Sequence, residues 1–140
     1  MEDVQQNIAK LRQAYQLWSD TRGGSADEWL KLFADDVVIP PPGGINVGVG
    51  FFKHYRGKSE ADDYFSALAD SWEVVYFTPE EFIGDGERVV VLSRVAMRCR
   101  ATGKVAESPK ADVFRFRDGA IIEFREFFNT ACAVDAEHED

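Results

Sequence analysis

Four of the charged residues that lie within segments rich in Val, Ile and Phe, in the second half of the chain, are candidates for acid–base chemistry. They are Arg94, Lys110, Asp112 and Glu126. A carboxylate held among hydrophobic side chains gains affinity for a proton, and such a group can act as a base or an acid. We therefore take Glu126 as a candidate base and expect the pKa of Asp112 to be raised. Arg94 and Lys110 are candidates for holding an anionic group.

The segments that carry these residues are predicted to be strands of one sheet. Apolar and β-branched residues dominate four stretches, which are residues 74–83, 88–100, 105–116 and 120–129. Between them lie Asp85-Gly86, Thr102-Gly103 and Asp118-Gly119, which are typical hairpin turns. Four consecutive strands joined by short turns predict an antiparallel meander.

Turn length decides which residues share a face, because a shift of one residue exchanges the two faces of a strand. A two-residue loop at Thr102-Gly103 requires a positive φ at Thr102, which β-branched residues resist. We therefore predict three-residue loops, which pair Arg100 with Lys104 and Phe116 with Ala120. In this register an apolar face separates from an arginine-rich face.

The predicted inner face carries a few polar residues among hydrophobic ones. Arg94, Lys110 and Glu126 fall in one row across three strands, and Asp112 falls in the next row between Leu92 and Phe124. Convergent polar groups on an apolar face are typical of a ligand pocket. A purely structural alternative is a buried ion pair of Glu126 with Arg94 or Lys110. We expect Arg94 and Glu126 to form a salt bridge.

Helices are predicted in the first half. Ile8, Leu11, Tyr15 and Trp18 recur at helical spacing within residues 4–19. Two further helices are predicted, one beginning with a capping box of Ser25 and Glu28 and one beginning at Ser59 with Asp62 in the same role. The loop between them contains Gly48-Val49-Gly50, which lacks the remaining features of a phosphate-binding loop. Helices followed by a meander predict an α+β fold.

The bulk composition limits the classes of function. The chain has 140 residues and a net charge of -9, so we expect one domain over residues 1–134 and an acidic tail over residues 135–140. An acidic surface disfavours nucleic acid and anionic membranes as partners. Cys99 and Cys132 have no metal-binding spacing and indicate free thiols in a reducing, cytoplasmic compartment. We expect neither a metal nor another cofactor.

Several local patterns resemble the nuclear transport factor 2-like (NTF2-like) superfamily, in particular its SnoaL-like and ketosteroid isomerase-like members. The patterns are Phe33-Ala34-Asp35-Asp36, Tyr55-Arg56-Gly57, Thr102-Gly103-Lys104 and the run from Val113 to Gly119. The resemblance covers nearly the whole chain. It implies N-terminal helices packed in a strongly curved antiparallel sheet, a cone-shaped, cystatin-like roll with an internal pocket, commonly as a homodimer. It does not imply one reaction, because this fold hosts enzymes, binding proteins and structural proteins.

The resemblance to ketosteroid isomerases implies an oxyanion hole. In those enzymes a tyrosine of the first helix and a strand aspartate hold the developing negative charge. Tyr15 and Asp112 match those positions. The isomerase base corresponds to about Pro41, which cannot accept a proton.

Two other catalytic patterns of the superfamily are also incomplete. Arg94 and Glu126 match two members of the triad found in limonene epoxide hydrolase-like proteins, but the third position is Ala96. In polyketide cyclase-like proteins an acid follows the aromatic pair of the last strand, and here that position is Asn129.

Three hypotheses remain open. The first is an enzyme of the isomerase, cyclase, dehydratase or epoxide hydrolase type acting on a small apolar carbonyl compound or epoxide. The second is a carrier or sensor that uses the same pocket, and the third is a dimerisation module whose pocket has collapsed. The candidate catalytic residues are Tyr15, Asp112, Glu126 and Arg94, and the candidate substrate-binding residues are Trp18, Lys110, Phe114, Phe124 and Phe128. We expect a homodimer formed through an outer sheet face that carries Val95, Met97, Cys99, Val105 and Val113.

Overall fold

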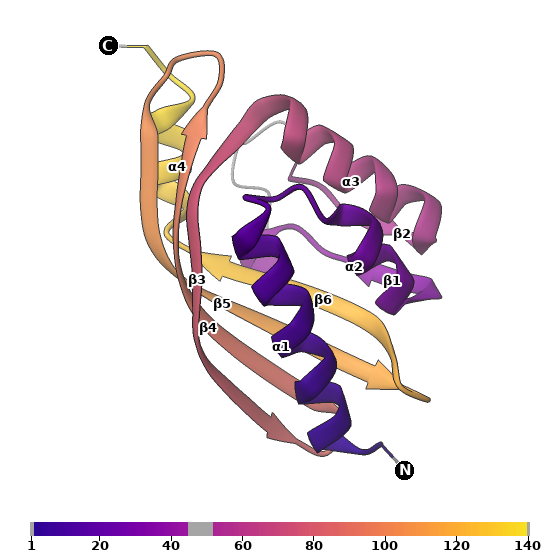
Figure 1. Cartoon of the computed structure of the whole chain (residues 1–140). Coiled ribbons are helices and arrows are strands. Elements are labelled where there is room, and N and C mark those ends of the chain that lie inside the picture. The colour runs from indigo at the N-terminus through magenta and orange to yellow at the C-terminus, as the bar shows by residue number, and fades with distance from the viewer. Residues whose placement is uncertain (1, 45–51, 140) are drawn as a thin grey trace.

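Four long strands follow one another in the second half of the chain and form most of a single curved sheet (Figure 1). The computed structural model describes residues 2–44 and 52–139. The strands are β3 (Trp72–Asp85), β4 (Arg88–Cys99), β5 (Val105–Arg117) and β6 (Ala120–Phe128). Each pairs antiparallel with the next, so the predicted meander is confirmed. Two register shifts in β3 mark irregularities of the kind that bend a sheet.

The sheet is completed by two shorter strands from the first half of the chain. β1 (Phe33–Ile39) pairs antiparallel with β2 (Tyr55–Arg56) and parallel with β6, which gives the strand order β2-β1-β6-β5-β4-β3. The sheet is therefore mixed, with a single parallel pair among the described strands. It is curved and unclosed, and the α+β prediction is confirmed.

Three helices pack inside the curve of the sheet (Figure 1). They are α1 (Val4–Asp20), α2 (Ala26–Leu32) and α3 (Gly57–Ser71). α1 begins where the Asp3 carboxylate accepts hydrogen bonds from the backbone N–H groups of Gln5 and Gln6. Its predicted apolar stripe is buried, and Tyr15 is only 2% exposed. A fourth helix, α4 (Thr130–Ala136), follows β6 and includes the first two residues of the predicted tail.

Both predicted capping boxes are absent. Ser25 occupies the N-cap position of α2, but its side chain makes no capping hydrogen bond, and Glu28 pairs with Lys31 instead. α3 begins at Gly57, two residues earlier than predicted, where Glu60 accepts a hydrogen bond from the backbone N–H of Arg56. Between these helices Pro42–Gly44 forms a single 3-10 turn, and Gly48-Val49-Gly50 lies outside the described residues.

The hairpin between β4 and β5 is one residue longer than predicted. Arg98 pairs with Val105, and the backbone N–H of Cys99 donates to the carbonyl of Lys104, which leaves a four-residue loop of residues 100–103. Gly103 has the predicted positive φ of 76°. The extra residue exchanges the faces of β4, so the side chains of Arg94 and Leu92 lie on the outer face.

The hairpin between β5 and β6 is one residue shorter than predicted, but the faces of β6 are retained. Asp118 and Gly119 form a two-residue loop with φ values of 53° and 77°, which suits a type I′ turn. A register shift then follows, because Phe116 pairs with Ile121 while Arg115 pairs with Glu123. The skipped Ile122 is an extra residue of the bulge type, and it restores the inward direction of the residues beyond it.

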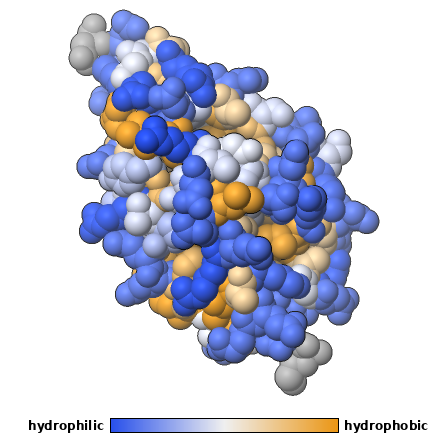
Figure 2. Space-filling view, in the orientation of Figure 1, coloured by the Kyte–Doolittle hydropathy of each residue, from blue (hydrophilic) through white to orange (hydrophobic). Residues whose placement is uncertain are grey.

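The surface is mostly polar and the interior is strongly aromatic. Figure 2 shows hydrophilic side chains over most of the face in view, interrupted by small hydrophobic areas. Inside, Phe114 stacks on Phe124 with 5.0 Å between ring centroids, and Trp29 also stacks on Phe114 at 5.9 Å. Within the described ranges no helix is long and apolar enough to cross a membrane. Cys99 and Cys132 are free thiols.

Candidate functional site

A cavity of about 90 Å³ lies between the inner face of the sheet and the helices. By the same measure one water needs about 10–15 Å³, so the space suits a small organic molecule. Most of its walls are aromatic or aliphatic, and the polar side chains come from α1, α3, β5 and β6. The residues that line it are Tyr15, Trp18, Trp29, Phe52, Tyr64, Phe65, Leu68, Trp72, Phe77, Val95, Met97, Ala106, Ser108, Lys110, Asp112, Phe124, Glu126, Phe128, Cys132 and Ala133.

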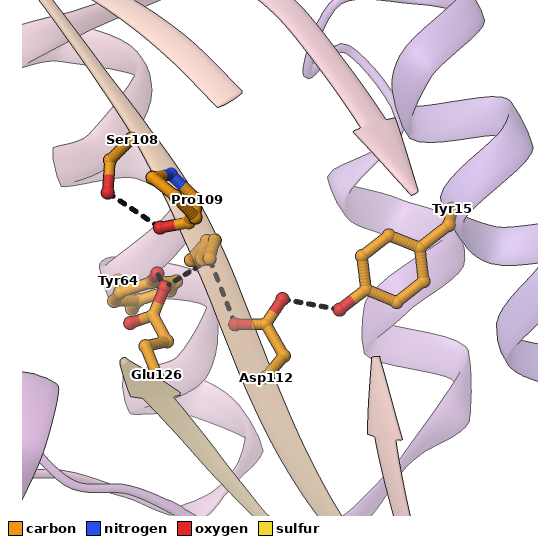
Figure 3. Close-up of polar contacts among 7 residues, drawn as sticks. Tyr15, Tyr64, Ser108, Pro109, Asp112 and Glu126 are labelled. Atoms are coloured by element: carbon orange, nitrogen blue, oxygen red, sulfur yellow. Dashed lines mark hydrogen bonds and ion pairs between the residues drawn. The ribbon is translucent and has the colours of Figure 1, made fainter. Parts of the chain in front are cut away.

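Tyr15 and Asp112 meet inside this cavity from opposite sides (Figure 3). The Tyr15 hydroxyl donates a hydrogen bond of 2.5 Å to Asp112 Oδ2. Asp112 is only 1% exposed and Tyr15 only 2%. Tyr15 belongs to the apolar stripe of α1, and this stripe faces the sheet. Asp112 points into the cavity because alternate side chains of β5 point to the inner face. The predicted approach of these two residues is confirmed.

Glu126 lies on the neighbouring strand, directly opposite Asp112. Its Oε1 atom accepts a hydrogen bond of 2.7 Å from the Tyr64 hydroxyl and one of 3.0 Å from Lys110 Nζ. Lys110 Nζ also lies 3.1 Å from Asp112 Oδ1, so one ammonium bridges both carboxylates. The ion pair of Lys110 with Glu126 is present, but Lys110 contacts Asp112 as well. The predicted row is wrong, because Lys110 pairs along the ladder with Phe128 while Asp112 pairs with Glu126.

Two buried carboxylate oxygens have no hydrogen-bond donor among the described residues. They are Glu126 Oε2 and Asp112 Oδ1. The Lys110 contact to Asp112 Oδ1 is a close ion pair without the alignment of a hydrogen bond, and we count it as electrostatic only. Buried acceptors normally receive a hydrogen bond. We therefore expect a bound molecule to interact with these two oxygens.

Burial dominates the proton affinities in this cluster. It raises the pKa of Asp112 above its ordinary value; the Lys110 ammonium opposes this shift, and the negative charge of Glu126 adds to it. Burial and then the charge of Asp112 raise the pKa of Tyr15 far above its usual range. Burial alone lowers the pKa of Lys110, but the two carboxylates outweigh that effect and raise it. Lys110 therefore stays charged, and Asp112 is the acid whose affinity for a proton is raised.

Two of the predicted site residues lie elsewhere. Arg94 points outward, with 65% of its side chain exposed, and pairs with Glu80 at 3.6 Å. The predicted Arg94–Glu126 salt bridge is therefore wrong, because the longer hairpin loop places these residues on opposite faces of the sheet. Phe114 does not line the cavity; it is fully buried behind Phe124 and belongs to the aromatic core. The other predicted residues, Trp18, Lys110, Phe124 and Phe128, do line it.

Tyr64 was missed by the sequence reasoning. Phe65 and Leu68 mark the apolar face of α3, and Ala61 and Tyr64 complete the i, i+3, i+4, i+7 pattern on that same face. The spacing was therefore available as a signal. What it cannot show is that the hydroxyl meets Glu126, a residue 62 positions further along the chain.

Asn129, where the polyketide cyclase-like pattern has an acid, has a structural role here. Its Oδ1 atom accepts a hydrogen bond of 3.2 Å from the backbone N–H of Cys132 and caps α4. In the part of the chain that the structure describes, no group of three or more His, Cys, Asp and Glu side chains is arranged to hold a metal ion. Chemistry at this site is thus to be sought in the buried cluster of Tyr15, Tyr64, Lys110, Asp112 and Glu126.

A family model for the SnoaL-like domain matches residues 11–124, most of the chain. The chain belongs to the SnoaL-like domain family. The match extends from the middle of α1 to β6 and includes the whole described sheet up to Phe124. The SnoaL-like resemblance of the local patterns is therefore confirmed. No curated protein matches the chain.

Solved structures of SnoaL-like and NTF2-like proteins share this fold. An NTF2-like protein of unknown function from Burkholderia pseudomallei is 24% identical, with a TM-score of 0.77 over 93% of this chain and 95% of that chain. A Jannaschia protein provisionally named a SnoaL-like polyketide cyclase is 20% identical, with a TM-score of 0.74 over 97% and 94%. A Bacillus subtilis protein provisionally named an isomerase is 18% identical, with a TM-score of 0.75 over 97% and 96%. At these identities the likeness shows the fold alone.

Proposed function

We propose that this protein is an enzyme that moves a proton within a small, largely apolar carbonyl compound, or opens a small epoxide, by acid–base chemistry. The observation that carries the proposal is the buried Glu126 Oε2, a carboxylate oxygen without a described donor in an aromatic cavity. An oxygen with no described donor can accept a proton from a bound molecule directly, which is the geometry that a general base needs.

In the carbonyl reaction Glu126 takes a proton from the carbon next to the carbonyl group. The negative charge that develops on the substrate oxygen needs a donor in the same cavity. Tyr15 fills this role when Asp112 carries a proton, because the carboxylic acid then donates to the tyrosine oxygen and the tyrosine proton turns to the substrate. In the structure Asp112 accepts from Tyr15 and faces the Lys110 ammonium, which are the contacts of an ionised carboxylate, so this mechanism requires Asp112 to gain a proton when the substrate binds.

Lys110 and Tyr64 position the base. Both bind Glu126 Oε1 and leave Oε2 for the substrate. The expected substrates are those of an isomerase, cyclase, dehydratase or epoxide hydrolase, in keeping with the provisional names of two structural neighbours. The free thiols support a reducing, cytoplasmic location, which we retain as part of the proposal.

The test measures proton exchange, which does not require the natural substrate. Small cyclic ketones, such as cyclohexanone and 2-methylcyclopentanone, are incubated with the protein in D₂O, and deuterium uptake next to the carbonyl is followed by NMR. Cyclohexene oxide serves as the epoxide probe, with diol formation as the product. Exchange or hydrolysis above the buffer rate is expected for the wild type and is expected to be lost in Glu126→Gln.

The matched control is Glu123→Gln, the same change three residues away on β6. Glu123 pairs with Arg125 at 3.1 Å outside the cavity, so this variant is expected to keep the wild-type rate. Equal rates in Glu126→Gln and Glu123→Gln would refute the assigned base.

A non-catalytic carrier or sensor is the second candidate. Its support is the ion pairing of Lys110 with both carboxylates, which holds the cluster in a stable arrangement without a substrate. Ligand binding by the wild type with no exchange on any probe would favour this function over the enzyme.

A further inference from the structure

The polar part of the cavity carries an unbalanced charge. Among the described residues that line it, two are acids, Asp112 and Glu126, and one is a cation, Lys110. Their side chains are 1%, 4% and 11% exposed, so water screens the imbalance poorly. The sequence of residues 45–51 contains no ionisable side chain that could balance it. The other titratable groups among the described lining residues are Tyr15, Tyr64 and Cys132, and none of these three supplies a positive charge.

Lys110 has little capacity left for an anion. Its ammonium contacts Glu126 Oε1 at 3.0 Å and Asp112 Oδ1 at 3.1 Å. It also lies 5.4 Å from the centre of the Phe77 ring and 5.7 Å from that of Phe124, within the range of cation–π attraction. The other predicted cation, Arg94, is on the outer face. An anionic ligand would therefore meet two carboxylates and no uncommitted positive charge among the described lining residues.

Two unsatisfied polar atoms on residues that line the cavity are carboxylate oxygens, and a third is the indole N–H donor of Trp72. Glu126 Oε2 and Asp112 Oδ1 have no described hydrogen-bond donor, and a bound molecule gains most by bringing one. The walls add a second preference, because the faces of aromatic rings carry partial negative charge and attract cations. Trp18, Trp29, Trp72, Phe77, Phe124 and Phe128 line the same space.

We propose that the cavity selects small apolar molecules that carry a hydroxyl or a protonated amine, and that it rejects carboxylates of the same shape. The inference rests on the proposed function to the extent that it names the substrate class of the same site. It makes the substrate an uncharged or cationic compound that binds more tightly when it carries a hydrogen-bond donor, and it excludes keto acids.

Three ligands of similar shape test the selection. Benzylamine, benzyl alcohol and benzoate each place one polar group on a single ring, and their affinities are measured by isothermal titration calorimetry at neutral pH. We expect benzylamine to bind most tightly and benzyl alcohol next. Benzoate is expected to bind at least about 100-fold more weakly than benzylamine, because like charges at close range in a buried site cost several kcal/mol.

Variants test which group causes the selection. Glu126→Gln leaves one acid and one cation, so the preference for benzylamine over benzoate is expected to fall at least tenfold. Asp112→Asn removes the same amount of negative charge. It replaces Glu126→Gln in the test if that variant folds poorly. Glu123→Gln, outside the cavity, is expected to keep the wild-type preference.

Benzoate binding to the wild type as tightly as benzyl alcohol would overturn the proposal, and so would the absence of binding by both benzylamine and benzyl alcohol. The experiments distinguish failure of the ligand selection from failure of the proposed enzymatic function. The expected order of affinities without proton exchange on any ketone supports the selection and removes the enzyme. Proton exchange on keto acids as fast as on ketones supports the enzyme and removes the selection.

Discussion

Replacing Lys110 with Met removes the single cation from the buried cluster while keeping a side chain of similar length. Two carboxylates at 3.0 and 3.1 Å lose their counter-charge. At an effective dielectric constant of about 20, each such contact is worth roughly 5 kcal/mol before desolvation is counted. Breaking a buried pair by removing one partner costs about 3–5 kcal/mol net, because the remaining charge is left uncompensated. We therefore expect the free energy of unfolding to fall by that amount at neutral pH.

The loss is expected to depend on pH with a definite sign. The pKa of Asp112 in the folded protein is already raised above its ordinary value of 3.8, and removing the Lys110 ammonium raises it further. A group with a raised folded pKa contributes stability below its unfolded pKa and loses it as the pH rises through the folded pKa. The difference between Lys110→Met and the wild type should thus be smallest near pH 4 and grow as the pH rises.

Urea unfolding followed by circular dichroism between pH 4 and pH 8 measures this difference. The matched control is Lys31→Met, which removes an ion pair of the same 3.0 Å length with Glu28 at a 70% exposed side chain. An exposed pair is worth less than about 1 kcal/mol. Adding Glu126→Gln to Lys110→Met removes one stranded charge and should restore part of the stability. Similar, pH-independent losses for Lys110→Met and Lys31→Met would show that the buried charges are not coupled as described.

Three further predictions concern single side chains. Tyr15→Phe removes the donor to Asp112 and should slow proton exchange at least tenfold, whereas an unchanged rate measured by NMR would exclude Tyr15 from the chemistry. Arg94→Ala should leave both exchange and urea midpoint unchanged, because this side chain faces solvent; a loss of exchange would return it to the site. Phe127, which is 41% exposed on the outer sheet face, is predicted to lie in a homodimer interface. Phe127→Glu should shift sedimentation velocity toward the monomer, and a wild type that sediments as a monomer at micromolar concentration would contradict the dimer.

The outer face differs from the one predicted. Val95 and Met97 were expected there, but both line the cavity, and Cys99 is buried. Val105 is 47% exposed. These changes follow from the same one-residue error in the β4–β5 hairpin that misplaced Arg94. The sequence indicated the turn by Thr102-Gly103, but it did not contain the information that separates a three-residue loop from a four-residue one.

The elements themselves were predictable because their signals are local. The strands have apolar residues and glycine-containing turns, and α1 has an apolar residue at every turn on one side. The parallel pairing of β1 with β6 was not predicted, because it joins segments about 90 residues apart and leaves no local pattern. The contact of Tyr64 with Glu126 also joins residues far apart in the chain and leaves no local pattern in the sequence. Pairings of this kind are fixed by how helices and sheet pack together.

Asp112 and Glu126 were placed on the inner face for a reason that was only partly correct. The predicted loop between β5 and β6 was one residue too long, which alone would have exchanged the faces of β6. The bulge at Ile122, which was not predicted, shifts the register again and brings Glu126 back to the inner face. The β4–β5 hairpin has no such shift in its described ladder, so the equivalent error there moved Arg94 to the outside. A charged residue in an apolar strand therefore supports a buried site only when other evidence shows that its side chain points to the inner face of the sheet. For Asp112 and Glu126 that support is their direct pairing across the ladder and the tyrosine that each one binds.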